Sequence, residues 1–431
     1  MPDDLASGLA EDPIAMEVFA NRLLSISEEM GNALVRSSFS TNIKERKDCS
    51  VGLLDAQGRC VTQAAHMPMH LGSLLGSVVS VLERYPVEAM AEGDAFICND
   101  VFLAHGTHQP DITIVTPIFH DGRVRFFAAN VGHHSDVGGP HPGSMSQSAR
   151  SIFEEGIRIP VMRFTREGRI DEDLLNMIAH NTREPEERAL DLRVQVAVNQ
   201  RGAELVARLV EAEGIEAVER SVEDLLRYTR RRLRARIAAL PDGTYRGERW
   251  MDGDGVAGSD LLPIRVAVTV SGPDILLDFD GTGPQARGAL NLSRSGLEAT
   301  CAYAVKTMLD PEIPPNSGLF GAIAGVSGAV ISGAAMHVPT GPTIVLVATA
   351  LVLFFGGLME RNGVAGVTVG VVVAFNAYVL LIAQPIRFLG FVILLLTQAV
   401  SSARRVFEIL DAPTTITSKP EAVAPDAMRG H

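Results

Sequence analysis

Two histidine motifs lie at the ends of one predicted β-hairpin, and they limit how this chain can fold more than any other feature. The first, His105-Gly-Thr-His-Gln-Pro-Asp111, precedes one strand, and the second, Gly132-His-His-Ser-Asp136, follows the other. Between them, alternating side chains and the dipeptide Asp121-Gly122 predict two antiparallel strands joined by a tight turn. A hairpin brings its two ends together, so both motifs must meet at one end of a sheet.

The number of residues in the turn decides which histidine faces Asp111. A three-residue loop would pair Asp111 with Val131 and put His133 on the same face as Asp111. A two-residue loop would shift the register by one, and His134 would take that face instead. His108 lies in the turn just before the first strand. The residues therefore predict a set of three side chains, which are His108, Asp111 and either His133 or His134.

This part of the chain also concentrates the groups that bind metals. Eight of the eleven histidines lie between His66 and His141. Imidazole and carboxylate groups are the usual ligands of a catalytic divalent metal, and three of them leave positions open for water or substrate. The alternative is that these polar loop residues only form hydrogen bonds to the backbone. The occurrence of both motifs on one hairpin favours a metal site.

The pattern of the chain indicates a soluble α+β region with mixed sheets and helices, followed by an all-α, membrane-like tail. Apolar side chains at helical spacing predict helices over residues 13–38 and 70–85 and through the charge-rich stretch 172–240. Alternation and turn signals predict strands over residues 51–55, 59–62, 94–99, 111–119, 123–131, 243–250, 262–270 and 275–280. We expect four regions: an α+β metal-site region (1–170), a helical region (171–240), a β-rich region (241–320) and the hydrophobic helical tail (321–431).

Charge and cysteine content are typical of an acidic cytosolic protein. The formal net charge of −13 argues against nucleic acid or an acidic membrane surface as the main partner. The four cysteines have no CxxC spacing, so we expect reduced thiols and neither disulfides nor a zinc-thiolate site. The N-terminus lacks the basic region and apolar run of a signal peptide. We therefore expect residues 1–320 to be cytoplasmic.

The composition changes at residue 321. No charged side chain occurs between Gly321 and Met359, and residues 362–386 and 388–403 are also uncharged. Since a membrane-spanning helix needs roughly 20 mostly apolar residues, the tail is predicted to associate with a membrane. The predicted segments lie near residues 321–337, 343–359, 364–382 and 388–403. The alternative is a buried helical core of a soluble protein.

A series of short motifs runs in order through the first 320 residues. They are Asn42-Ile-Lys-Glu-Arg-Lys-Asp48, Ala65-His-Met-Pro-Met-His-Leu-Gly-Ser73, Gly106-Thr-His-Gln-Pro-Asp111, Gly132-His-His-Ser-Asp-Val-Gly-Gly139, Pro142-Gly-Ser144, Glu155-Gly-Ile-Arg-Ile-Pro160, Asn181-Thr-Arg183, Asp278-Phe-Asp-Gly-Thr282 and Ile313-Pro-Pro-Asn-Ser-Gly318. Each motif is short, but the ordered set is specific. With this set, residues 12–320 resemble the hydantoinase B/oxoprolinase family, whose relatives include the acetone carboxylase α-type subunits.

The resemblance implies a ligand set. In the carboxylase relatives an HxxD pair and a later histidine hold a divalent metal, which implies His108, Asp111 and His133 in this chain. Manganese, zinc and iron are the candidate metals. The same alignment makes His134 and Asp136 candidates for catalytic residues beside the metal or facing the substrate.

Several other polar residues remain candidates. Arg183 is a third catalytic candidate, able to bind a carboxylate or a phosphate. His66 and His70 are four residues apart, but a proline between them interrupts a common helical face. The charged residues 44–48 could bind an anionic substrate or form an ion-paired loop. The family pattern Asn-Asp-Pro is replaced here by Asn99-Asp100-Val101, a departure that affects the local turn and not the ligands.

The resemblance also implies a division of labour. A hydantoinase A-type partner binds ATP and activates a cyclic amide or a ketone by phosphorylation, and the B-type chain completes ring hydrolysis or carboxylation. This sequence contains no GxxxxGK[ST] phosphate loop, so ATP use would depend on the partner. We therefore expect a B-type subunit acting in hydrolysis of a hydantoin or 5-oxoproline type of cyclic amide. The alternative is a subunit of an ATP-dependent ketone carboxylase.

The family resemblance stops after Gly318, and the tail is similar to fragments of ABC transporter membrane domains. Residues 326–355 resemble the last helices of a metal-uptake permease, and residues 366–413 resemble the end of an exporter membrane domain. The chain would then be a fusion, a composite of unrelated pieces, or a chain whose tail has a false resemblance. A composite predicts a tail that packs poorly on the first 320 residues. Its function would be that of a membrane-associated protein without catalytic activity.

Overall fold

The fold was analysed in a computed structural model. It describes residues 13–64, 67, 70–144, 149–254, 261–288 and 290–327, together with residues 353, 355–356, 358–359, 361, 368–375 and 377. The chain divides into two compact units, Met1–Val372 and Val373–His431. Both sheets, the eight helices described below and the candidate site belong to the first unit.

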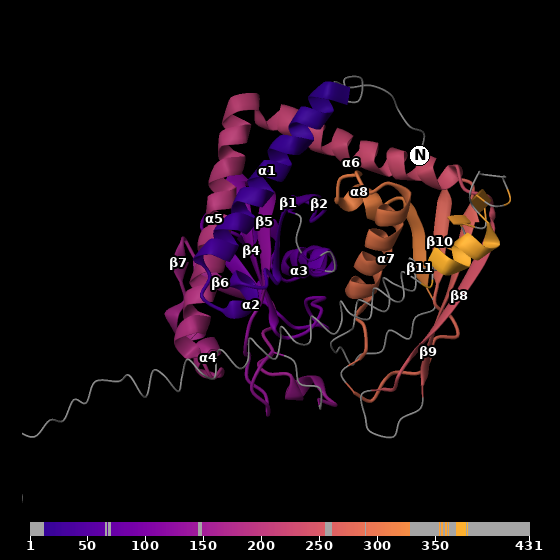
Figure 1. The fold of residues 1–431 in the computed structure, drawn as a ribbon. Helices are drawn as coiled ribbons and strands as arrows, with labels where there is room; N and C mark the ends of the chain where they lie inside the picture. The colour runs from indigo at the N-terminus through magenta and orange to yellow at the C-terminus, as the bar shows by residue number, and fades with distance from the viewer. Residues whose placement is uncertain are drawn as a thin grey trace, which may run out of the picture. The chain divides into compact units, whose positions relative to one another are not determined.

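A seven-stranded antiparallel sheet forms the centre of the first half of the chain (Figure 1). Its strand order is β2-β1-β5-β4-β3-β6-β7. The strands are β1 (Cys49–Asp55), β2 (Cys60–Gln63), β3 (Ala95–Cys98), β4 (Asp111–His120), β5 (Arg123–His133), β6 (Met162–Arg166) and β7 (Arg169–Ile170). The predicted hairpin over residues 51–62 and the three strands that follow it are confirmed. The short strands β6 and β7 were not predicted.

The register of β4 and β5 differs from both predicted registers. The turn has two residues, Asp121 and Gly122, whose φ angles of 50° and 69° are those of a type I′ turn. Arg125 has no partner across the pair, because Phe119 pairs with Val124 while Ile118 pairs with Phe126. This β-bulge shifts the rest of the pair by one more residue.

As a result, Asp111 pairs directly with His133. The two-residue loop alone would have put His134 on the face of Asp111, and the predicted pairing of Asp111 with Val131 is also wrong. The bulge returns His133 to that face, which is the face that the three-residue loop had favoured for a different reason.

Eight α-helices accompany the two sheets in the part of the chain that the structure describes up to residue 327. They are α1 (Pro13–Ser37), α2 (Thr41–Lys44), α3 (His70–Arg84), α4 (Glu172–His180), α5 (Pro185–Glu213), α6 (Ile215–Ala238), α7 (Arg294–Leu309) and α8 (Ser317–Phe320). The predicted helices over residues 13–38 and 70–85 are confirmed, and residues 172–240 form α4, α5 and α6. The four cysteines are buried free thiols, as expected.

The two faces of the seven-stranded sheet are covered by different helices. Helices α1 and α5 pack on one face and α3 packs on the other (Figure 1). Successive side chains of a strand point to opposite faces, and on β5 Ala128 packs toward α1 while Ala129 packs toward α3. His133 therefore shares the α3 face with Asp111, whereas His134 projects toward α5.

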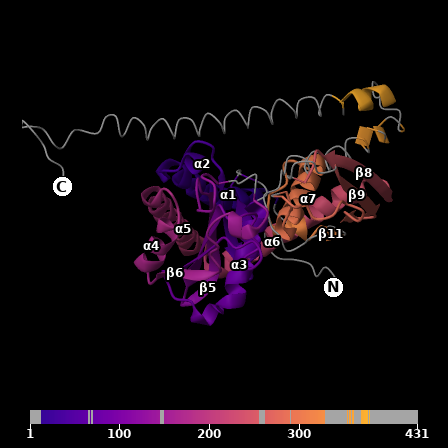
Figure 2. The same cartoon turned by 90° about the horizontal axis from the view of Figure 1, so that it is seen from below.

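A second, four-stranded sheet has the order β11-β10-β9-β8 and packs with α6, α7 and α8 (Figure 2). Its strands are β8 (Gly243–Met251), β9 (Leu262–Ser271), β10 (Asp274–Asp278) and β11 (Ile323–Ser327). β11 pairs in parallel with β10, and Ala322, Ile323 and Val326 contribute to the core of this sheet.

The prediction of a membrane helix over residues 321–337 is therefore wrong for its first part. Residues 323–327 form a sheet strand, so the folded core continues past residue 320 instead of ending there. Within the described residues, no helix is both long enough and apolar enough to cross a membrane. Of the other predicted segments, 388–403 lies wholly and 343–359 largely outside the described residues, and about half of 364–382 is described.

One close contact joins the two halves of this unit. Gly72, in the first turn of α3, lies so near the start of α7 that a Cβ atom there would be 2.2 Å from the carbonyl oxygen of Ser295. The hydroxyl of Ser295 also donates a hydrogen bond to the carbonyl oxygen of His105, at 2.7 Å. The start of α7 thus touches two segments that carry histidines of the candidate site.

We expect a chain that ends at residue 320 to be less stable than the full chain, because it loses β11. Complete burial of an aliphatic side chain stabilises a fold by about 1.5–3 kcal/mol, so loss of the half-buried Ile323 and Val326 should lower the free energy of unfolding by about 2 kcal/mol. Urea denaturation would measure the difference, with a chain ending at residue 360 as the control. Equal stability of the 320-residue chain and the control would contradict the role of β11.

Candidate metal centre

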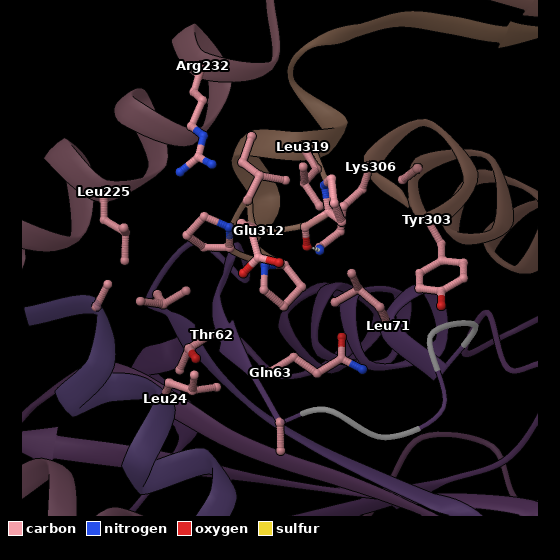
Figure 3. Close-up of a pocket in the computed structure, with 18 of the residues that line it drawn as sticks. Leu24, Thr62, Gln63, Leu71, Leu225, Arg232, Tyr303, Lys306, Glu312 and Leu319 are labelled. Atoms are coloured by element: carbon pink, nitrogen blue, oxygen red, sulfur yellow. Dashed lines mark hydrogen bonds between the residues drawn. The ribbon is translucent and has the colours of Figure 1, made fainter. Parts of the chain in front are cut away.

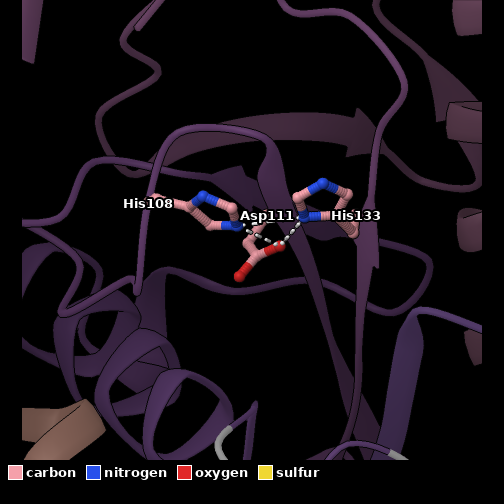
Figure 4. Close-up of side chains that lie close together, drawn as sticks. All are labelled: His108, Asp111 and His133. Carbon is pink, nitrogen blue, oxygen red and sulfur yellow. Dashed lines mark hydrogen bonds and ion pairs between the residues drawn. The ribbon is translucent and has the colours of Figure 1, made fainter. Parts of the chain in front are cut away.

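Three side chains converge where the two histidine motifs meet (Figure 4). One oxygen of Asp111, Oδ1, lies 3.0 Å from Nε2 of His108 and 2.9 Å from Nδ1 of His133. The two ring nitrogens are themselves 3.0 Å apart. All three residues are at most 5% exposed. Two imidazole nitrogens and one carboxylate oxygen are thus held together in a buried site, which we call the ligand cluster.

The sheet positions each member of the ligand cluster. Asp111 begins β4 and His133 ends β5, so their pairing across the strands places the two side chains next to each other. His108 belongs to the preceding turn, where its carbonyl oxygen accepts a hydrogen bond from the N–H of Asp111 at 3.1 Å. Thr107 donates a hydrogen bond from its hydroxyl to Oδ2 of Asp111, the oxygen that faces away from His133.

Two residues from other elements join the ligand cluster. Nε2 of His70, at the start of α3, lies 3.5 Å from Oδ2 of Asp111 and 3.9 Å from Oδ1 of Asp48, just before β1. The sequence indicated His70 only as a weak candidate and placed Asp48 in a charged loop. Asp48 and His70 both belong to the ordered motifs that resemble the family, at residues 42–48 and 65–73, and this was the one sign in the sequence that they belong to the site. His66, the other candidate of that pair, lies outside the described residues.

The carboxylates and imidazoles at the site stabilise each other's charged forms. Burial alone would raise the pKa of Asp111, but the charges of His108 and His70 and hydrogen bonds from the histidines outweigh it and hold that pKa well below its ordinary value. Burial would lower the pKa of His70 and of His133, yet the carboxylates of Asp111 and Asp48 raise both. The carboxylate therefore stays ionised, as a metal ligand must be.

The geometry fits a divalent metal. Two ligand atoms at right angles to each other, each about 2.1 Å from a metal, lie about 3.0 Å apart, and this is the separation among the three atoms here. Two histidines and one carboxylate on one side of a metal leave the opposite positions open. In addition, Nε2 of His133 and Nδ1 of His70 are buried and have no hydrogen-bond partner among the described residues.

His134 lies on the other face of the sheet, away from the ligand cluster. Its Nε2 donates to Oε1 of Gln195 at 2.9 Å, and its Nδ1 accepts from the guanidinium of Arg188. The Gln195 amide is itself fixed, because its nitrogen donates to the carbonyl oxygen of Ile112. Burial and the charge of Arg188 hold the pKa of His134 well below its usual value. His134 is thus a neutral imidazole with both nitrogens occupied by protein groups.

Asp136 and Arg183, the other two residues predicted to be catalytic, form a separate network. The Asp136 carboxylate accepts hydrogen bonds from the backbone N–H groups of Gly138 and Gly143, at 2.9 and 3.1 Å, and from the Arg183 guanidinium at 2.8 Å. Arg183 also donates to the carbonyl oxygen of Gly139. These bonds hold the glycine-rich loop that follows His133, and no hydrogen bond among the described residues joins the pair to the ligand cluster.

Arg188 was not predicted from the sequence, although it is completely buried. Its guanidinium donates to the hydroxyl of Ser135 at 2.7 Å and to the carbonyl oxygen of Asp136 at 3.1 Å, besides its bond to His134. Asp191, one turn further along α5, balances the charge at 3.7 Å. Arg188 on α5 therefore forms hydrogen bonds to three consecutive residues after His133, which are His134, Ser135 and Asp136.

A cavity of about 560 Å³ lies between α1, β2, α3, α6 and α7 (Figure 3). Its wall combines aliphatic side chains such as Leu24, Leu71 and Leu225 with polar ones. The polar side chains that line it are Glu17, Asn21, Glu28, Thr62, Gln63, Arg232, Tyr303, Lys306 and Glu312. Leu71, which directly follows His70 at the start of α3, belongs to this wall, and no member of the ligand cluster lines the cavity.

Comparison with protein families identifies the chain. The sequence model of the family described as Hydantoinase B/oxoprolinase matches residues 12–357. The chain belongs to this family. The match includes residues 321–357. The sequence predicts the beginning of a transporter-like tail in this stretch, and that interpretation is wrong for these residues.

Several curated proteins are similar to the chain. An uncharacterized protein of Methanocaldococcus jannaschii is 32% identical over 312 residues, which cover 72% of this chain and 54% of that protein. The 5-oxoprolinase 1 of Arabidopsis thaliana is 32% identical over 340 residues, covering 73% and 26%. The putative B-type subunit of a D-/L-hydantoinase from a Pseudomonas strain is 29% identical, covering 72% and 54%. The match thus spans about half the length of the first and third proteins and about a quarter of the oxoprolinase.

Two solved structures have a similar fold. Acetone carboxylase in its nucleotide-free form aligns with a TM-score of 0.73 and 21% identity, over 83% of this chain and 50% of the other. The ATP-dependent caprolactamase of Pseudomonas jessenii aligns with a TM-score of 0.70 and 26% identity, over 80% and 60%. The mixed sheets and helices described above are therefore shared with both enzymes.

We expect the substitution Arg188→Met to destabilise the fold strongly. It would remove the positive charge paired with the buried carboxylate of Asp191 and the donor to Nδ1 of the buried His134, and breaking a buried ion pair in this way costs about 3–5 kcal/mol. Arg193→Met, also on α5, removes only the exposed pair with Glu172 and should cost about 1 kcal/mol or less. Thermal or urea unfolding would compare the two variants, and equal losses would contradict the role given to Arg188.

The three histidines should differ in protonation in the metal-free protein. A raised pKa keeps an imidazole protonated above its usual range, and a lowered one keeps it neutral, so at about pH 6 His70 and His133 should be charged while His134 is neutral with its proton on Nε2. Nitrogen-15 chemical shifts of the imidazole rings report each state directly. A charged His134 at this pH would be inconsistent with the Arg188–His134–Gln195 arrangement.

Proposed function

We propose that this chain is the B-type component of an ATP-dependent hydrolase of cyclic amides, of the hydantoin or 5-oxoproline type. The single observation that carries the proposal is the ligand cluster, in which two imidazole nitrogens and one carboxylate oxygen lie within about 3 Å of one another at the end of the β4–β5 hairpin. The names of the relatives, which include 5-oxoprolinase and hydantoinase, support cyclic amides as the substrates.

In this proposal His108, Asp111 and His133 hold a divalent metal, which is manganese, zinc or iron. A bound metal of this kind polarises a carbonyl oxygen or lowers the pKa of a water molecule. Asp111 contributes a permanent negative charge, because the surrounding histidines keep it ionised. His70 holds a proton at Nε2 between the carboxylates of Asp111 and Asp48, and from there it can donate this proton and take it back without a large movement.

We assign His134, Asp136 and Arg183 to positioning. His134 fixes the end of β5 from the α5 side, and the pair of Asp136 with Arg183 closes the following glycine-rich loop. Their hydrogen bonds to protein groups support this assignment over direct contact with the substrate. Residues that orient the ligands in this way affect metal affinity and activity without touching the reacting atoms.

The activity requires parts outside this chain. The match spans about half the length of the hydantoinase relative and a quarter of an oxoprolinase, and the sequence contains no phosphate loop. We therefore propose that ATP is bound by an A-type partner, which activates the substrate before the ring is opened. The ketone carboxylase alternative rests on a structural neighbour at 21% identity, which is evidence of the fold alone. The relatives whose names imply cyclic amides favour hydrolysis.

Metal analysis of the purified full-length chain tests the proposal. We expect bound divalent metal in the wild-type protein and a loss of about tenfold or more in affinity in His108→Ala and Asp111→Asn, because the first removes one ligand and the second removes the negative charge of another. His120→Ala is the matched control, since His120 is a partly exposed histidine at the opposite end of β4. Equal metal content in the four proteins would remove the central claim.

A further inference from the structure

Gln109, inside the first histidine motif, has a side chain that the ligand cluster does not use. It is completely buried, and neither its amide nitrogen nor its amide oxygen has a hydrogen-bond partner among the described residues. Each buried polar group left without a partner costs about 1–3 kcal/mol. A carboxamide with both atoms free in the interior is therefore a strong sign that a polar molecule binds there.

The backbone of Gln109 is fixed on both sides. Its N–H donates to Oε2 of Glu155 at 3.2 Å, and its carbonyl oxygen accepts from Nδ2 of Asn99 at 2.7 Å. Asn99 is itself anchored by a hydrogen bond from its Nδ2 to the carbonyl oxygen of Ile157 and by one that its Oδ1 accepts from the N–H of Ile159. The main chain is thus held in place while the buried carboxamide has no partner among the described residues, and a fixed backbone of this kind preorganises a side chain for recognition.

Gln109 lies between two members of the ligand cluster in the sequence. It directly follows His108 and precedes Asp111 by two residues. The other carboxylate oxygen of Glu155, Oε1, is also buried without a partner in the described part of the chain, and burial raises the pKa of Glu155 to about 7, a shift to which the nearby Asp111 adds. The two amide atoms of Gln109 and Oε1 of Glu155 are thus three buried polar atoms without a partner in the described part of the chain, on two residues that a hydrogen bond joins.

The chemistry of a carboxamide indicates which ligand it fits. A glutamine side chain offers an N–H donor and an oxygen acceptor side by side, and it uses both at once when it reads the edge of an adenine. A secondary amide in a small ring is held in the cis form, so its N–H and C=O point to the same side and match this pair. An open-chain secondary amide is trans by about 2.5–4 kcal/mol, so its N–H and C=O point to opposite sides.

We propose that Gln109 recognises the cis amide of the ring through two hydrogen bonds, Nε2–H to the ring carbonyl oxygen and the ring N–H to Oε1. Glu155 and Asn99 are positioning residues that hold its backbone. This role deepens the proposed function, on which it rests for the class of substrate. It makes Gln109 the residue that selects cyclic over open-chain amides and turns the ring carbonyl toward the ligand cluster.

Two small probes test the paired hydrogen bonds. 2-Pyrrolidinone has the ring N–H, N-methyl-2-pyrrolidinone lacks it, and their binding to the full-length chain can be measured by calorimetry or ligand-observed NMR. We expect the wild-type protein to bind 2-pyrrolidinone about tenfold more tightly, the value of one net hydrogen bond. In Gln109→Met, whose side chain has a similar size and no hydrogen-bonding group, binding of 2-pyrrolidinone should fall by about 10–100-fold and the preference between the probes should disappear.

Gln200→Met is the matched control, because Gln200 is exposed on α5 and should leave both affinities unchanged. Melting temperature and metal content are measured for every variant. If Gln109→Met does not fold, equal binding of the two probes to the wild-type protein would still overturn the proposal. Equal binding of the probes, binding of neither, or a preference that survives Gln109→Met would overturn the proposal, because the Gln109 carboxamide would then not be what recognises the ring N–H.

The outcome is independent of the metal claim. Loss of the preference in Gln109→Met with unchanged metal content supports recognition by Gln109. A wild-type chain that distinguishes the probes but holds no metal would refute the proposed metal centre and leave the role of Gln109 intact.

Discussion

The candidate site depends on the pairing of Asp111 with His133 across β4 and β5. These residues are far apart in the chain, and only the strand register brings their side chains together. Because side chains alternate along a strand, a shift of one residue would exchange His133 for His134 and turn the second imidazole to the wrong face of the sheet. The register is set at the other end of the hairpin, by the two-residue turn and the bulge at Arg125. A local irregularity thus determines the composition of a site that lies most of a strand away from it.

Adjacent histidines serve opposite faces of one sheet. On one face His133 joins a buried group of imidazoles and carboxylates whose charges offset the cost of removing them from water. On the other face His134 stays neutral between Arg188 and Gln195. The hydrogen bonds of His134 support the position of His133, because they fix the end of β5 against α5 and so keep it paired with β4. Precise placement of this kind matters at a functional site, because an error of about 1 Å changes both affinity and rate.

The sequence predicted the elements well because helices and strands follow local patterns. It predicted that His108 and Asp111 meet a histidine of the second motif because both motifs flank one hairpin, but the hairpin alone left His133 and His134 open, and only the family resemblance favoured His133. It failed on features with no local signal. The bulge at Arg125 depends on how the whole sheet twists, and Arg188 resembles an ordinary charged residue of a helix until its burial is known. The uncharged stretch after residue 320 misled for a related reason, since small apolar residues suit a covered strand as well as a membrane helix and composition does not distinguish them.

The contact between Gly72 and Ser295 gives the second sheet a part in the geometry of the first. With no room for a Cβ atom, α3 rests directly on the backbone at the start of α7, and the Ser295 hydroxyl holds His105 in the same place. His70 lies two residues before Gly72. The contact of Gly72 with the start of α7 therefore limits the position of His70 relative to Asp111. The distance between α3 and α7 thereby affects the distance between the His70 imidazole and the Asp111 carboxylate. Substitutions near Ser295, in the C-terminal half of this unit, are therefore constrained by the position that His70 must keep in the N-terminal half.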